Sequence, residues 1–283
     1  MALTAADIAA ERRRGRLAAA AAIAAAVLFP VGLFWSQLTN NDRPDENAPA
    51  QLRFFRQHSF DLLASAVVRT IAFALLLLVT IHLYRATKAR KPDLSPVVGF
   101  VGVFGPIAAA LGGLAHDVYL GFAASDFTGR EFQTLEGAED LTKNAFVYIT
   151  VGFSIAGTAA LAFWFVIGSL NAMRVGLLTR FTGVLGIIIG PAFLLGFAPL
   201  LLTFWLIAIG LLFICRWPRG VPPAWAAGEA IPWPSRPPGG DQPPEEEVGG
   251  ARNGEVEPVG PGVRRGEESE PPDTPPRKRK RRT

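Results

Sequence analysis

The sequence predicts an all-α membrane protein, a polytopic transmembrane helix bundle of about six spans with a disordered C-terminal tail. Half of the 283 residues are hydrophobic, and they gather in long runs over the first two thirds of the chain. Several runs reach the roughly 20 residues with which a helix crosses about 30 Å of hydrocarbon. Since backbone polar groups in lipid must bond within their own segment, such runs are expected to be helical.

The predicted transmembrane domain covers residues 17–216 and follows a basic cytoplasmic lead-in, residues 1–16. In the lead-in, Thr4 and Asp7 have the spacing of a capping box, which predicts the start of a short helix. Pro30 is interpreted as a tolerated kink in the first span, and Pro106 as a break in the third. The six predicted spans lie at about 17–38, 62–84, 97–119, 145–170, 181–197 and 199–215.

The last two spans are predicted by dividing one uncharged run, which extends from Phe181 to Cys215. A single helix of that length would measure about 52 Å, far more than the hydrocarbon thickness. Gly196 and Pro199 mark the turn, because Pro opens a helix readily and disrupts the middle of one. A re-entrant hairpin is the alternative to two short spans.

The distribution of Lys and Arg predicts the orientation, because cytoplasmic segments next to spans carry the excess of basic residues. With the N-terminus inside, the inner segments carry twelve basic residues: Arg12, Arg13, Arg14, Arg16, Arg85, Lys88, Arg90, Lys91, Arg174, Arg180, Arg216 and Arg219. The outer loops carry five: Arg43, Arg53, Arg56, Arg130 and Lys143. Both termini are therefore predicted to be cytoplasmic. A composition rich in Ala, Arg and Gly agrees with a GC-rich bacterial source and hence with the plasma membrane.

Residues 217–283 are predicted to form the disordered cytoplasmic tail, because Pro, Gly, Glu and Arg bury too little apolar surface to offset ordering entropy. Its first part, 221–234, contains Trp225 and Trp233 and is expected near the lipid headgroups. Its polybasic end is expected to contact anionic inner-leaflet lipids, at up to about 1 kcal/mol per charge. Nucleic acid is the less favoured partner, and folding back onto the acidic stretch 241–273 is a third alternative. The basic residues are Arg277, Lys278, Arg279, Lys280, Arg281 and Arg282.

Arg69 is the most informative polar residue inside a predicted span. It lies about 12 Å along the helix from Asp61, where an unpaired Arg would cost at least about 2.5 kcal/mol. Asp117, next to His116, lies at a comparable depth in the following span, which predicts an Arg69–Asp117 pair. The alternatives are a structural ion pair, an Arg that reaches the interface, or a site for a substrate or ion.

Small residues four apart predict helix faces that allow close approach in lipid. Packing within one bundle is the favoured interpretation, and homo-oligomerisation is the alternative. The predicted faces are Gly105/Ala109/Gly113, Gly152/Ala156/Ala160 and Gly186/Gly190.

No catalytic residue, metal site or cofactor is predicted. The three histidines are spread over a loop and opposite ends of two spans, and Ser154 lacks a later His that would act as its base. Cys215 is the single cysteine, so Cys-based metal and redox motifs are excluded.

Four stretches carry a resemblance to a known family: 174–187, 204–206, 216–225 and 228–234. The third of them begins with Arg216-Trp217-Pro218-Arg219-Gly220. In these stretches the chain resembles uncharacterised actinobacterial multi-pass membrane proteins. The resemblance implies a six-helix membrane protein and transfers no activity.

Two functions are compatible with these features. The favoured one is a non-enzymatic membrane scaffold or regulatory protein that reaches an unknown protein partner through its tail. The alternative is a small-solute or ion transporter that uses Arg69 and Asp117. A water-accessible cavity at Arg69 would favour transport, and a dry, closely packed bundle would favour the scaffold.

Overall fold

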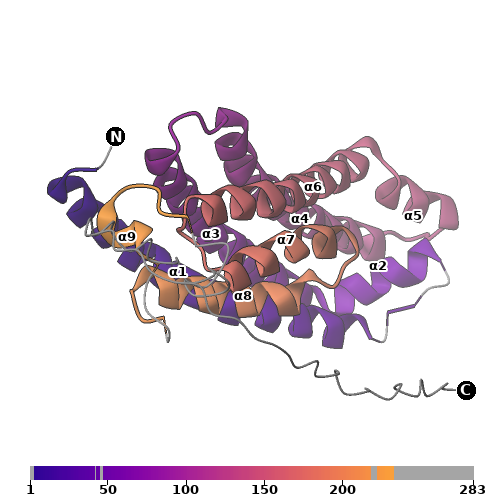
Figure 1. Ribbon diagram of the computed structural model, residues 1–283. Coiled ribbons are helices and arrows are strands. Elements are labelled where there is room, and N and C mark those ends of the chain that lie inside the picture. Colours follow the sequence, from indigo (N-terminus) through magenta and orange to yellow (C-terminus); the bar gives the residue numbers. More distant parts are fainter. Residues whose placement is uncertain (1–2, 42, 45–46, 218–221, 233–283) are drawn as a thin grey trace, which may run out of the picture. The chain divides into compact units, whose positions relative to one another are not determined.

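The computed structural model describes residues 3–41, 43–44, 47–217 and 222–232, and these residues form helices and no strand, as predicted. The chain divides into two units, residues 1–235 and 236–283, and the second lies outside the described residues. The predictions for Trp233, the acidic stretch and the polybasic cluster therefore also lie outside them. The helices are α1 (Ala5–Asn40), α2 (Ala48–Gln57), α3 (Ser59–Arg90), α4 (Pro96–Gly129), α5 (Leu135–Thr142), α6 (Ala145–Arg174), α7 (Arg180–Leu194), α8 (Ala198–Phe213) and α9 (Ala224–Ala227) (Figure 1).

Four of these helices, α1, α3, α4 and α6, are long and apolar enough to cross a membrane. The helices α7 and α8 have 15 and 16 residues, which corresponds to about 22–24 Å and falls short of the hydrocarbon thickness of about 30 Å. The chain turns between them at Gly196, whose φ of 81° is the left-handed conformation that glycine adopts at little cost. The predicted break in the uncharged run is therefore present.

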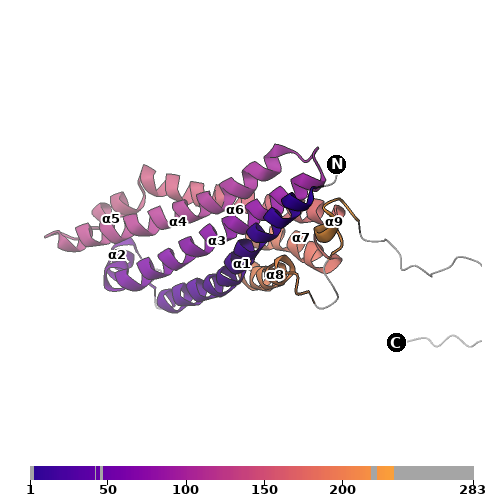
Figure 2. The ribbon, with the colours of Figure 1, turned by 90° about the vertical axis from the view of Figure 1, so that its left-hand side faces the viewer.

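The six large helices pack in a ring that follows the chain order. Each of α1, α3, α4, α6 and α7 contacts the next, and α8 returns to α1. The neighbouring helices α1, α3 and α4 are visible side by side in Figure 2. The largest buried side chains come from several helices and include Trp164, Phe165, Trp205 and Leu76.

The interface between α4 and α6 brings two backbones into direct contact. A Cβ atom on Gly157 would lie 2.3 Å from the backbone nitrogen of Ala109, and one on Gly112 would lie 2.6 Å from that of Ser154. Such contacts provide the van der Waals packing that holds helices together where lipid removes the hydrophobic driving force.

Three of the small residues that the sequence analysis assigned to helix contacts face elsewhere. Gly113 and Gly152 have no atom within 4 Å of an added Cβ, and Ala156 is exposed. The α4–α6 contact uses the neighbouring Gly112 and Gly157 instead. The predicted Gly186/Gly190 face of α7 does pack, because added Cβ atoms there would meet α6.

Several helices extend beyond the predicted boundaries, and the largest differences are in α1 and α4. The capping box at Thr4 is present, but α1 continues from Ala5 through Pro30, so the lead-in is not a separate short helix. Likewise α4 passes Pro106 without a break and ends at Gly129, ten residues beyond the predicted limit. Proline is tolerated in membrane helices where neighbouring groups satisfy the freed backbone carbonyl.

The predicted outer loops, which follow the first and the third span, contain the short helices α2 and α5, and both helices pack on the end of α4. Side-chain caps start both helices: Asn47 Oδ1 accepts from Ala50 N at 2.9 Å, and Thr134 Oγ1 accepts from Gly137 N at 3.2 Å. We call this part the helical cap; its apolar core contains Leu52, Phe54, Phe55, Leu62, Leu120, Ala123, Ala124, Phe127 and Ala138.

At the opposite end of the bundle, residues 222–232 correct the prediction of a tail disordered from 217. This docked segment contains α9 and is bonded to the bundle: Trp225 Nε1 donates to Leu177 O at 2.9 Å, and Ile231 N donates to Val175 O at 3.2 Å. Trp225 thus packs on the helices of the bundle. The composition of this segment does not indicate that its two large apolar side chains, Trp225 and Ile231, pack on the bundle.

Candidate functional site

The sequence-predicted polar site lies where α3 and α4 meet below the helical cap. Arg69 Nη2 lies 2.6 Å from Asp117 Oδ2, so the predicted ion pair is present. The side chain of Arg69 is 39% exposed and that of Asp117 is 18% exposed. We call this contact the α3–α4 ion pair.

The aliphatic part of Arg69 packs on α1, since an added Cβ on Gly32 would lie 2.9 Å from Arg69 Cγ. Ten residues separate Arg69 from the first residue of α3, Ser59, which is about 15 Å along the helix axis. The guanidinium group is directed to Asp117. An ion pair between helices therefore describes Arg69 better than an arginine that reaches the membrane interface.

Two buried polar atoms near this pair have no hydrogen-bond partner in the described part of the chain: Arg69 Nε and His116 Nδ1. His116 lies beside Asp117 in α4, and neither a hydrogen bond nor an ion pair joins the two described residues His116 and Arg69. The described residues also contain no group of three His, Cys, Asp or Glu side chains that would hold a metal ion. Chemically, the pair is an electrostatic link between two helices with spare hydrogen-bonding capacity.

The sequence analysis missed a second charged cluster, at the end of the bundle where α1 begins. Arg90 has a fully buried side chain and binds Glu11 with two bonds, Nη1–Oε1 at 2.8 Å and Nη2–Oε2 at 3.2 Å. Its Nε donates to the carbonyl oxygen of Ala224 in α9 at 3.0 Å. Its guanidinium also lies 5.3 Å from the ring centroid of Trp225. We call this cluster the Arg90 junction.

The Arg90 junction joins three segments that are far apart in the sequence: α1, α3 and the docked segment. The sequence indicates Arg90 only as one of the cytoplasmic charges that set the orientation. The one available signal was Glu11, an acidic residue directly before the arginines of the basic lead-in. Nothing in the local pattern indicates which of the many arginines is its partner.

His82 is buried next to this junction. Its ring stacks on Trp225 at 6.0 Å and meets the edge of Phe213 at 4.7 Å between centroids. It faces Gly15 of α1, where an added Cβ would lie 3.4 Å from His82 Nε2, at van der Waals distance. His82 Nε2 has no hydrogen-bond partner among the described residues.

Comparison of the chain with protein-family models, with curated proteins and with solved structures finds no match. The all-helical fold and its four long apolar helices define the class, a helical membrane protein. The resemblance to actinobacterial multi-pass proteins stays a prediction, and the role of the chain must be argued from its geometry.

Proposed function

We propose that the chain is a non-enzymatic membrane scaffold or regulatory protein that holds its C-terminal region at the cytoplasmic face for a protein partner. The docked segment carries this proposal. The Arg90 junction and the Trp225 and Ile231 hydrogen bonds attach it to α1, α3 and the turn after α6. The polypeptide after residue 232 therefore starts from a defined place on the bundle.

The proposed embedding has six spans, with α7 and α8 as two short ones, and both termini on the cytoplasmic side of the plasma membrane. The excess of Lys and Arg at the end of the bundle where α1 begins supports this orientation. The helical cap then lies outside. The polybasic residues 277–282 are proposed to contact anionic inner-leaflet lipids.

The close contact of α4 with α6 supports a packed bundle more than a transport pathway. Cavities of about 720, 390 and 230 Å³ in the described part are not lined by Arg69 or Asp117. A small-solute or ion transporter remains the second candidate, because Arg69 Nε and His116 Nδ1 are buried with no hydrogen-bond partner among the described residues.

The test compares the full chain with a chain that ends at Pro232 and so keeps the docked segment. Both would be purified from their native membrane in mild detergent after chemical crosslinking. The scaffold proposal expects a partner crosslinked to the full chain and lost from the shortened one. An unchanged set of crosslinked proteins would contradict it.

A matched variant separates partner binding from lipid binding by the tail. Replacing residues 277–282 by Gln removes six charges and keeps the length. The partner crosslink is expected to persist in this variant, while flotation with vesicles containing phosphatidylglycerol falls. Solute flux into vesicles that disappears with Arg69→Leu would instead favour the transporter.

A further inference from the structure

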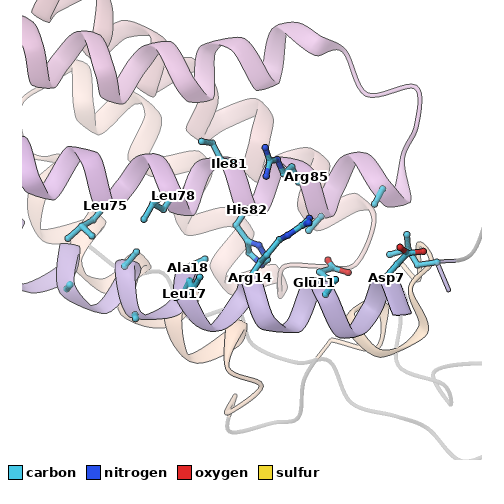
Figure 3. A pocket seen from close by; sticks show the side chains of 17 residues that line it. Asp7, Glu11, Arg14, Leu17, Ala18, Leu75, Leu78, Ile81, His82 and Arg85 are labelled. Atoms are coloured by element: carbon cyan, nitrogen blue, oxygen red, sulfur yellow. The ribbon is translucent and has the colours of Figure 1, made fainter. Parts of the chain in front are cut away.

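A cavity lies between α1 and α3, at the end of the bundle where α1 begins. It has a volume of about 720 Å³, within the range of roughly 300–1,000 Å³ that is usual for small-ligand sites. We call it the α1–α3 groove. Figure 3 shows its lining: polar side chains gather toward the start of α1, and aliphatic ones line the remainder.

The walls of the groove are one face of each helix. On α1 the lining residues recur every three or four positions, at Ala10, Arg14, Leu17, Ala21 and Ala24. Alanine side chains leave the space that larger residues would fill. On α3 the facing wall is formed by Leu75, Leu78, Ile81, His82 and Arg85.

The depth of the apolar part matches one leaflet of a bilayer. From Arg14 to Ala24, and likewise from Arg85 to Leu75, the helix rises about 15 Å over ten residues. This is half of the roughly 30 Å of hydrocarbon. Each wall thus carries one arginine at the same height above an equally long aliphatic surface.

Both arginines are available to a ligand. Neither Arg14 nor Arg85 has an ion pair or hydrogen bond with another described residue, and both are exposed. Figure 3 shows Arg14 reaching from α1 toward α3, where it lies next to His82.

The carboxylates of the groove are already occupied. Glu11 binds Arg90 through both oxygens, and Asp7 accepts the Thr4 hydroxyl and amide at the start of α1. With Glu11 neutralised by Arg90, the two arginines of the groove outnumber the one remaining carboxylate, Asp7, so the mouth carries a net positive charge.

We propose that the α1–α3 groove binds one anionic phospholipid, with its phosphate at Arg14 and Arg85 and an acyl chain along Leu17–Ala24 and Leu75–Leu78. Guanidinium groups suit phosphate oxygens because they donate hydrogen bonds in a planar fork. Because the walls are aliphatic, a phospholipid fits the groove better than a free phosphate compound does. This inference rests on the membrane embedding proposed above and is independent of the scaffold role and of the tail.

The test measures lipid affinity of the full chain in mild detergent by native mass spectrometry. Dioleoyl phosphatidylglycerol and dioleoyl phosphatidylcholine share their acyl chains and differ in headgroup charge. One phosphatidylglycerol is expected to bind with a preference of about 30-fold, from roughly fivefold per arginine. Equal affinity for the two lipids would overturn the proposal.

Charge variants locate the headgroup. Arg14→Gln with Arg85→Gln is expected to abolish the preference. Arg13→Gln with Arg16→Gln removes the same charge from exposed positions of α1 outside the groove and is expected to keep it. Equal losses in the two double variants would show a diffuse charge effect and contradict the site. The variant with Gln at 277–282 is expected to retain the preference, and its loss there would assign the binding to the tail.

Two further measurements locate the acyl chain. Ala24 is exposed and lines the deep end of the groove, so Ala24→Trp fills it without entering the packed core. This variant is expected to weaken binding of phosphatidylglycerol at least tenfold while the protein elutes as the folded species. Glycerophosphoglycerol, the headgroup alone, is expected not to compete. An unaffected Ala24→Trp, or competition by the headgroup alone, would place the acyl chain elsewhere.

Discussion

Arg90 and Glu11 form a two-pronged ion pair between the third and first helices, 79 positions apart in the sequence. The arginine side chain is fully buried and the glutamate is 14% exposed. Because Arg90 also donates to Ala224 O, this pair positions one of the contacts that hold the docked segment on the bundle. A buried charge left without its partner is strongly unfavourable.

Glu11→Ala is therefore expected to lower the free energy of unfolding by about 3–5 kcal/mol. It leaves the guanidinium of Arg90 buried with only carbonyl acceptors. Denaturant unfolding of the protein in mild detergent measures the change, and hydrogen exchange of residues 222–232 is expected to accelerate in parallel. Arg13→Ala, at an exposed position of the same helix, serves as the control. An equally small effect of both substitutions would mean that the junction contributes nothing to stability.

The α3–α4 ion pair predicts a coupled pair of substitutions. Arg69→Leu and Asp117→Leu should each destabilise the protein, and the double variant should lose about 1 kcal/mol less than the sum. A double-mutant cycle from unfolding in detergent gives this coupling. The comparison pair is Lys143 with Glu139, which are 60% and 44% exposed and should show no measurable coupling. Strict additivity at Arg69 and Asp117 would rule out an energetically relevant pair.

The existence of the long helices was predictable from the sequence because hydrocarbon thickness imposes a length on every apolar run. Asp117 was also predictable as the partner of Arg69, since the two lie at similar depths on consecutive helices. Depth along the membrane axis is thus encoded in the distance of a residue from the end of its apolar run.

Rotation of a helix about its own axis is not encoded in the same way. In lipid, the outward face is as apolar as the buried one, so Gly152 and Gly157 look equivalent in the sequence although only Gly157 touches α4. Pairs that are distant in the chain, such as Glu11 and Arg90, are ambiguous for a related reason. Many arginines lie at the same depth, and only the helix order around the ring selects one.

These two glycines allow a matched test of the α4–α6 contact. Gly157→Val places side-chain atoms where even a Cβ would lie 2.3 Å from Ala109 N, so the helices must separate. A loss of at least about 2 kcal/mol in unfolding free energy is expected. Gly152→Val has open space around the added Cβ and should leave stability unchanged. Unfolding midpoints in detergent compare the two, and a reversed order would refute the arrangement of α4 against α6.

The hairpin of α7 and α8 decides between six spans and a re-entrant loop. Because Cys215 is the single cysteine, Cys215→Ser gives a background in which one introduced thiol reports its own location. Phe197→Cys, in the exposed turn between the two helices, is expected to react with a membrane-impermeant maleimide from outside intact cells. Two helices of about 22–24 Å reach across only if the bilayer thins locally, at a modest cost per ångström.

Control positions show how a thiol on each side of the membrane reacts in this experiment. Asn41→Cys and Gly137→Cys, next to and within the helical cap, are expected to react from outside, and Ser95→Cys, between α3 and α4, only after the membrane is permeabilised. If Phe197→Cys reacted neither from outside nor after permeabilisation, its turn would lie within the hydrocarbon, and the last two helices would form a re-entrant hairpin that enters from the cytoplasmic side. Reaction of Asn41→Cys only after permeabilisation would reverse the proposed orientation of the whole bundle, and the α1–α3 groove would then lie in the outer leaflet.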